Sequence, residues 1–155
     1  MGTLQLTPAY AAALAPSACA VRDWLEVGGR PYAGFSAGAA VAADNALVGG
    51  WRFGAVQVCP DEAGEDVENV SVVAGLGLTP WTIDVHCAQW GTLPRLLSAV
   101  GALPDGRGLA IDENTALHID GDRGRVSGLG AVRAVTGSHD EFRVRTVVAG
   151  ASIAV

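Results

Sequence analysis

The sequence predicts an α/β fold in which a mainly parallel sheet lies between helices and continues into antiparallel strands near the C-terminus. Helical and strand-like segments alternate through the first two thirds of the chain, and short strand-like segments alone fill the last third. The chain has 155 residues, half of them hydrophobic, which suits one buried core but not two. We therefore expect residues 1–155 to form a single domain.

The N-terminal third is expected to contain helices on either side of a short strand. Residues 9–27 have helical spacing of apolar side chains, and Pro16 should kink or split this helix. Residues 32–35 are predicted to form a short buried strand, and residues 37–44 a helix. Ser36 thus stands between a strand and a helix.

Strands dominate the rest of the chain. The acid-rich run at residues 61–68 favours a solvated loop, with a calcium site as the alternative. Residues 70–78 and 81–86 are predicted strands, and residues 93–100 a helix. Further short strands are expected in the segments LAIDE, TALHID, RVSGLG, AVRAV and FRVRTVVAG.

Charge and composition argue against several classes of protein. The net charge is -6 and the ten basic residues are all isolated arginines, which gives no electrostatic footprint for nucleic acid. Cys19, Cys59 and Cys87 lack CxxC spacing, which favours reduced core thiols over disulfides or zinc ligands. The apolar N-terminal run has no basic segment before it, and no apolar run reaches the roughly 20 residues that span a membrane. We expect a soluble, cytoplasmic protein.

Ser36 is the strongest candidate for a catalytic residue. It lies in Gly34-Phe35-Ser36-Ala37-Gly38, a GxSxG pattern in which small residues leave room for a sharp turn that exposes the hydroxyl. A serine hydroxyl is a weak nucleophile, so it also needs a nearby base and donors for the developing oxyanion. The pattern therefore predicts a nucleophilic serine.

Three histidines are candidates for the base. His118 lies in an alternating strand and His139 in a polar turn, positions typical of surface residues, whereas His86 ends a short apolar strand. The carboxylate that orients it is Glu113, Asp112 or Asp84. With the order serine, histidine, acid, the chain differs from the serine, acid, histidine order of an α/β-hydrolase.

Three blocks, YAGFSAGAAV, DVHCAQWGTLPRLLSAV and GLAIDENTALHI, resemble the cyanophycinase and peptidase E (aspartyl dipeptidase) group of serine peptidases. The resemblance implies a fold like that of class I glutamine amidotransferases and hydrolysis of peptide bonds that involve aspartate. It places the nucleophile on Ser36, the histidine on His86 and, as in the cyanophycinase branch, the acid on Glu113. It also implies oxyanion donors at Ala37 and at Gly2.

Two departures from that group affect the interpretation. The segment that precedes the glycine pair in the group has no counterpart here, so we expect an N-terminally shortened domain whose open sheet edge is covered in a homodimer or higher oligomer, or else a fragment. Two of three arginines in the block after the histidine are replaced by Trp90 and Thr92. Arg95 remains and is expected to hold a substrate carboxylate.

The combined prediction is a serine peptidase that hydrolyses small aspartyl or β-aspartyl peptides through an acyl-enzyme on Ser36, with no metal or organic cofactor. The alternatives are a catalytically silent binding module and an esterase or amidase of another substrate class.

Overall fold

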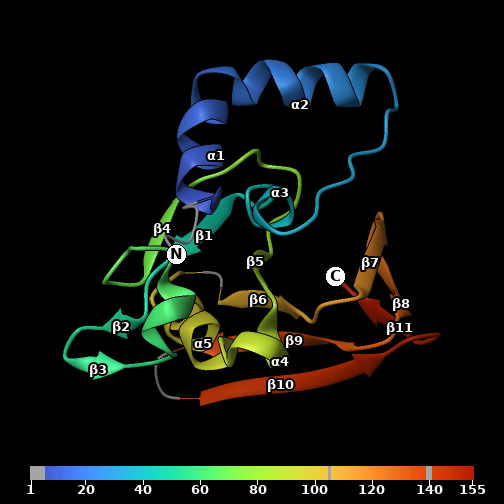
Figure 1. The fold of residues 1–155 in the computed structure, drawn as a ribbon. Coiled ribbons are helices and arrows are strands. Elements are labelled where there is room, and N and C mark those ends of the chain that lie inside the picture. Colours follow the sequence, from blue (N-terminus) through green and yellow to red (C-terminus); the bar gives the residue numbers. More distant parts are fainter. Residues whose placement is uncertain (1–5, 105, 139–140) are drawn as a thin grey trace.

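The computed structural model describes residues 6–104, 106–138 and 141–155. Its centre is a four-stranded sheet with the strand order β10-β9-β6-β5 (Figure 1). The strands are β5 (Thr82–Val85), β6 (Arg107–Ile111), β9 (Ala131–Ser138) and β10 (Glu141–Val148). Only β5 and β6 pair in parallel, while β6–β9 and β9–β10 are antiparallel.

The expected α/β class is therefore found, but the expectation of a mainly parallel sheet is wrong. Between β5 and β6 the chain passes through two helices, α4 (Cys87–Trp90) and α5 (Leu93–Gly101), and this helical crossover lets the two strands run in parallel. No helix follows β6 in the described residues, and the later strands of this sheet pair antiparallel. The smaller sheets, β1-β4, β2-β3 and β11-β8-β7, also pair antiparallel.

The central sheet is covered on both faces because its strands alternate apolar side chains between them. On one face, Leu96 and Val100 of α5 pack with Ala110 and Val135. On the other, Leu109 and Val132 pack with Val126 of the β11-β8-β7 sheet. That second sheet consists of β7 (Thr115–Asp120), β8 (Arg123–Gly128) and β11 (Ser152–Ala154).

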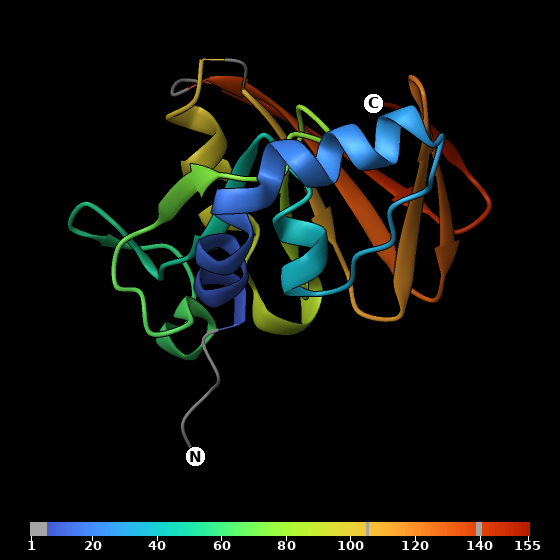
Figure 2. The same cartoon turned by 90° about the horizontal axis from the view of Figure 1, so that it is seen from above.

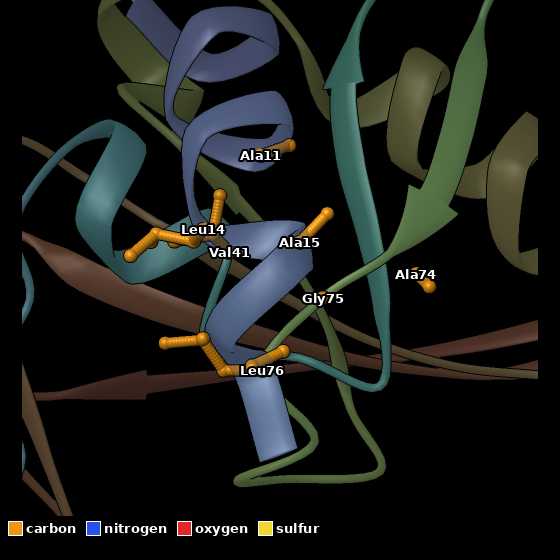
Figure 3. A pocket seen from close by; sticks show the side chains of 8 residues that line it. Ala11, Leu14, Ala15, Val41, Ala74, Gly75 and Leu76 are labelled. Carbon is orange, nitrogen blue, oxygen red and sulfur yellow. The ribbon is translucent and has the colours of Figure 1, made fainter. Parts of the chain in front are cut away.

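The N-terminal helices form a separate layer. Pro16 splits the expected helix into α1 (Leu6–Leu14), the 3-10 turn η1 (Ala15–Ser17) and α2 (Ala18–Val27). Figure 3 shows Ala11 and Leu14 beside Val41 and Leu76, in a small apolar pocket between α1 and the chain after α3. This packing holds α1 against the region that follows Ser36.

The remaining elements are short. They are α3 (Ala37–Ala40), β1 (Asn45–Gly49), β2 (Arg52–Phe53), β3 (Val56–Gln57), the 3-10 turn η2 (Asp61–Gly64), β4 (Ser71–Ala74) and α4 (Cys87–Trp90). The acid-rich run is tied to the N-terminal layer, because the Glu65 carboxylate accepts hydrogen bonds from the backbone N–H and the hydroxyl of Thr7. Among the described residues, no helix is long and apolar enough to cross a membrane.

One predicted strand is absent. Residues 28–35, here called the lead-in segment, are exposed and have no assigned strand, although residues 32–35 were expected to form a buried one. Figures 1 and 2 show this segment as an extended ribbon from the end of α2 to the start of α3. Apolar composition predicted burial, but burial in a sheet also requires a neighbouring strand, and the described chain provides none for this segment.

Candidate active site

Ser36 occupies a strained turn at the start of α3. Its backbone has φ 50° and ψ -124°, a conformation that non-glycine residues rarely adopt and that recurs at functional sites. Gly34 makes the turn possible, since a Cβ added there would lie 2.4 Å from the carbonyl oxygen of Gly38. The Tyr32 hydroxyl donates a hydrogen bond to the same oxygen at 2.7 Å. The expected sharp turn is therefore present, although no strand leads into it.

The three predicted catalytic side chains form one hydrogen-bonded chain. Ser36 Oγ lies 3.0 Å from His86 Nε2, and His86 Nδ1 lies 3.0 Å from Glu113 Oε1. Both distances fall in the range through which a base takes a proton from a nucleophile and a carboxylate holds an imidazole. The arrangement permits Nδ1–H to donate to Glu113 while Nε2 accepts from Ser36.

The parallel pair of strands explains why His86 and Glu113 meet. Val85 is paired with Ile111 at the ends of β5 and β6. His86 follows the first strand directly and Glu113 comes two residues after the second, so both side chains emerge at the same edge of the sheet. The sequence rule that functional side chains gather at the carboxyl ends of parallel strands therefore holds for this one pair.

The two other candidate carboxylates serve elsewhere. Asp84 is buried and accepts hydrogen bonds from Arg95 Nε at 3.0 Å and Nη2 at 2.6 Å. Burial disfavours the charge on Arg95, but the attraction of Asp84 and its hydrogen bonds outweigh burial and raise the pKa of the guanidinium. A third guanidinium contact is to the carbonyl of Ala63.

The placement of Arg95 contradicts its expected role in substrate binding. Only 3% of Arg95 is exposed, and each of its three guanidinium nitrogens has a protein partner. A buried arginine that already forms a two-point contact with a carboxylate has no surface left for a second one. Arg95 joins α5 to β5 and belongs to the core.

Asp112 is also buried, and it holds together the elements that carry the site. Its carboxylate accepts hydrogen bonds from Arg133 Nη1 at 2.6 Å and from the backbone N–H groups of Ala88 and Ala131 at 3.0 Å each. Burial alone would raise the pKa of Asp112, but these donors outweigh it and lower the pKa below its usual value. Asp112 thus ties α4 and β9 to the end of β6.

The oxyanion donors can be compared with the structure at one of two positions. Ala37 is the first residue of α3, and its backbone N–H makes no hydrogen bond to any described residue. Such free N–H groups at helix starts are available to a developing negative charge. Gly2, the second predicted donor, lies outside the described residues.

The other histidines do not approach this site in the described chain. His118 is exposed in β7 and pairs across the strands with Arg125, while His139 lies outside the described residues. No group of three or more histidine, cysteine or acidic side chains in the described part of the chain is arranged to hold a metal ion.

Two neighbours of the site were not predicted. Trp90 stacks on the His86 ring, with ring centroids 4.3 Å apart, and Gln89 Oε1 accepts the backbone N–H of Glu113 at 2.9 Å. The spacing of four residues between His86 and Trp90 on a helical turn was the available sequence signal.

Comparison with known proteins assigns the chain to a family. Residues 20–127 match the model of peptidase family S51. The chain belongs to this family. The resemblance seen in the sequence is thereby confirmed, and the S51 match includes Ser36, His86 and Glu113.

Two curated relatives of this S51 member are both named cyanophycinase. The chain is 35% identical over 119 residues to cyanophycinases from Trichormus variabilis and from a Nostoc species. Each alignment covers 74% of this chain and 36% of the relative, so the chain spans little more than a third of the length of these curated relatives. A solved peptidase from an acI-B1 actinobacterium matches 77% of this chain and 43% of its own, with 22% identity and a TM-score of 0.48.

Proposed function

We propose that this S51 member is a serine peptidase in which Ser36 is the nucleophile, His86 the general base and Glu113 the residue that orients the imidazole. The observation that carries the proposal is the continuous chain of hydrogen bonds from Ser36 Oγ through His86 to Glu113, each 3.0 Å long. The strained backbone of Ser36 supports it, because strain of this kind persists where a turn has to expose a side chain.

The mechanism follows from these positions. Ser36 Oγ attacks the scissile carbonyl carbon while His86 Nε2 takes the hydroxyl proton, and Glu113 stabilises the resulting imidazolium. The Ala37 N–H donates to the oxyanion of the tetrahedral intermediate. The protonated His86 then gives its proton to the leaving amine, the carbon–nitrogen bond breaks, and a water activated by the same histidine hydrolyses the acyl-enzyme.

For the substrate we propose small aspartyl or β-aspartyl peptides. Membership of the S51 family and the name cyanophycinase carried by two relatives support this class. Trp90 and Thr92 replace two arginines of the related block, which favours a short peptide over a long charged polymer. Since Arg95 is committed to Asp84, the substrate carboxylate requires a different partner.

The test combines a serine probe with a substrate panel. A fluorophosphonate should label the wild-type protein at Ser36 and leave Ser36→Ala unlabelled, and hydrolysis should fall at least about a thousandfold in that variant. Aspartyl and β-aspartyl dipeptides should be cleaved faster than p-nitrophenyl esters. Absence of labelling would support a silent binding module, while esters cleaved faster than all peptides would support an esterase.

We also propose that the chain functions as a homo-oligomer. Large apolar side chains are exposed on α2 and in the lead-in segment, with 59% of Trp24, 91% of Val27 and 90% of Phe35 accessible. Exposed apolar side chains close together in sequence are typical of surfaces that a partner covers. Light scattering should give at least a dimer at micromolar concentration, and a stable, active monomer would contradict the proposal.

A further inference from the structure

We propose that Trp90 and Gln89, the last two residues of α4, are positioning residues that hold His86 and Glu113 in their reactive arrangement. This inference rests on the proposed function, since it assigns a role in the same proton transfer. Neither residue belongs to the predicted set of catalytic and substrate-binding side chains, and both come from a helical turn of four residues, Cys87–Trp90.

Trp90 restrains the imidazole from one face. The two rings are stacked with a centroid separation of 4.3 Å and an interplanar angle of 21°. The turn that brings them together is closed by a hydrogen bond from the Trp90 N–H to the His86 carbonyl at 2.8 Å. A ring covered on its face cannot tilt freely, while its edge remains open for in-plane hydrogen bonds at both nitrogens.

The stack also suits the charge that forms on His86. Proton transfer from Ser36 turns the imidazole into an imidazolium, and the electron-rich face of an indole attracts a cation within about 6 Å of the ring centroid. The contact therefore strengthens as the tetrahedral intermediate forms. An interaction that is stronger in the transition state than in the ground state raises kcat rather than lowering KM.

Gln89 restrains the acid. Its side-chain oxygen accepts the backbone N–H of Glu113 at 2.9 Å, while the Glu113 carboxylate holds His86 Nδ1. The Glu113 side chain is 40% exposed, so water competes for its oxygens. When the Glu113 backbone is already fixed, less conformational entropy is lost as its carboxylate binds His86. Gln89 thus supports Glu113 without touching the reacting atoms.

The turn that carries both residues is itself anchored. The backbone N–H of Ala88 donates to the buried Asp112 carboxylate at 3.0 Å, directly beside Glu113 in the sequence. Three successive residues of α4 therefore contact the end of β6 or the histidine at the end of β5. This continuity is what a rigid support for two side chains from different strands requires.

Variants at Trp90 separate positioning from simple packing. Trp90→Leu keeps apolar bulk but loses the aromatic face, whereas Trp90→Phe keeps a ring that can stack. We expect Trp90→Leu to lower kcat and the rate of fluorophosphonate labelling about tenfold to a hundredfold, with KM within twofold of wild type. Trp90→Phe should recover most of both rates, and Gln89→Ala should lose about threefold to tenfold.

A variant at a distant exposed aromatic residue serves as the control. Phe53→Leu removes an exposed aromatic side chain on β2 and should leave both rates unchanged.

Three outcomes would overturn the inference. If Trp90→Leu is labelled at the wild-type rate, any apolar side chain suffices at this position. If the substitution affects KM alone, Trp90 is a substrate contact instead. A wild-type protein that the probe does not label overturns the proposed function first and the positioning role with it. Normal wild-type labelling with an unaffected Trp90→Leu overturns only the positioning role.

Discussion

The two halves of the candidate site are supported in different ways. His86 and Glu113 stand at the ends of paired strands, and their neighbours in sequence form ion pairs, a buried one between Asp84 and Arg95 and a partly buried one between Asp112 and Arg133. Ser36 instead follows the exposed lead-in segment and depends on a tight turn made by Gly34. One half is fixed by the core, and the other by local stereochemistry.

This difference indicates where each half is vulnerable. Damage to a buried ion pair should unfold the sheet that carries His86 and Glu113, because the remaining charge has no water to solvate it. Damage to the Ser36 turn should lower activity at a smaller cost in stability, because few core contacts depend on the lead-in segment. The following predictions test this contrast, beginning with the largest effect.

The strongest break in the core-supported half is Arg95→Ala. It leaves the Asp84 carboxylate buried and unpaired, and we expect the free energy of unfolding to fall by about 3–5 kcal/mol in urea denaturation. Arg52→Ala is the matched control, because the Arg52–Glu68 pair is exposed and should contribute less than about 1 kcal/mol. Unchanged stability of Arg95→Ala with a raised KM would instead restore the expected substrate role.

Asp112 should make this half sensitive to acid. Its pKa is lowered in the folded state, so its stabilising contribution is complete above about pH 4 and is lost as the pH falls through that lowered pKa. We expect Asp112→Asn to cost about 1.5–3 kcal/mol at neutral pH and less at more acidic pH. Urea denaturation of both proteins between neutral pH and pH 3 measures the difference, and a constant difference would contradict the assignment.

Gly34→Ala tests the other half. The new Cβ would meet the Gly38 carbonyl oxygen at 2.4 Å and its carbonyl carbon at 2.6 Å, so the turn has to open. We expect the free energy of unfolding to fall by about 1–3 kcal/mol. The rate of Ser36 labelling should fall further than it does in Arg52→Ala. Gly38→Ala is the control for stability, since its nearest neighbour would be the Tyr32 hydroxyl at 3.8 Å.

The same contrast explains what could be predicted from sequence. Ser36 and His86 were identifiable because a GxSxG turn and the end of an apolar strand are local patterns. The choice of Glu113 over Asp112 and Asp84 came from the family resemblance, and the structure brings Ser36, His86 and Glu113 together. The role of Arg95 was predicted wrongly because its pairing with Asp84 depends on how α5 packs against β5. Sequence spacing does not contain that information.

The prediction of a mainly parallel sheet was wrong for a related reason. Apolar residues in alternating or continuous runs identified most of the strands, but pairing direction depends on whether a connection is a crossover or a hairpin. In the described chain, the segment with α4 and α5 makes the crossover between the parallel strands β5 and β6, and no helix lies between the strands after β6. The lead-in segment has strand-like composition but no neighbour in the described chain, so composition alone gave the wrong state.

The smallest effect is expected from Tyr32→Phe, which removes the hydrogen bond from the hydroxyl to the Gly38 carbonyl across the Ser36 turn. Burial, with a smaller contribution from nearby Tyr10, raises the pKa of Tyr32, so the hydroxyl remains a donor at neutral and moderately alkaline pH. A single hydrogen bond contributes about 0.5–1.5 kcal/mol, which should appear as faster amide exchange at residues 33–38 and slightly slower Ser36 labelling, with no shift in global unfolding. Tyr10→Phe serves as the control, because the Tyr10 hydroxyl makes no hydrogen bond to any described residue and half of its surface is exposed. If Tyr32→Phe lowered the unfolding midpoint as much as Asp112→Asn does, the turn would be part of the core, and the distinction between the two halves would be wrong.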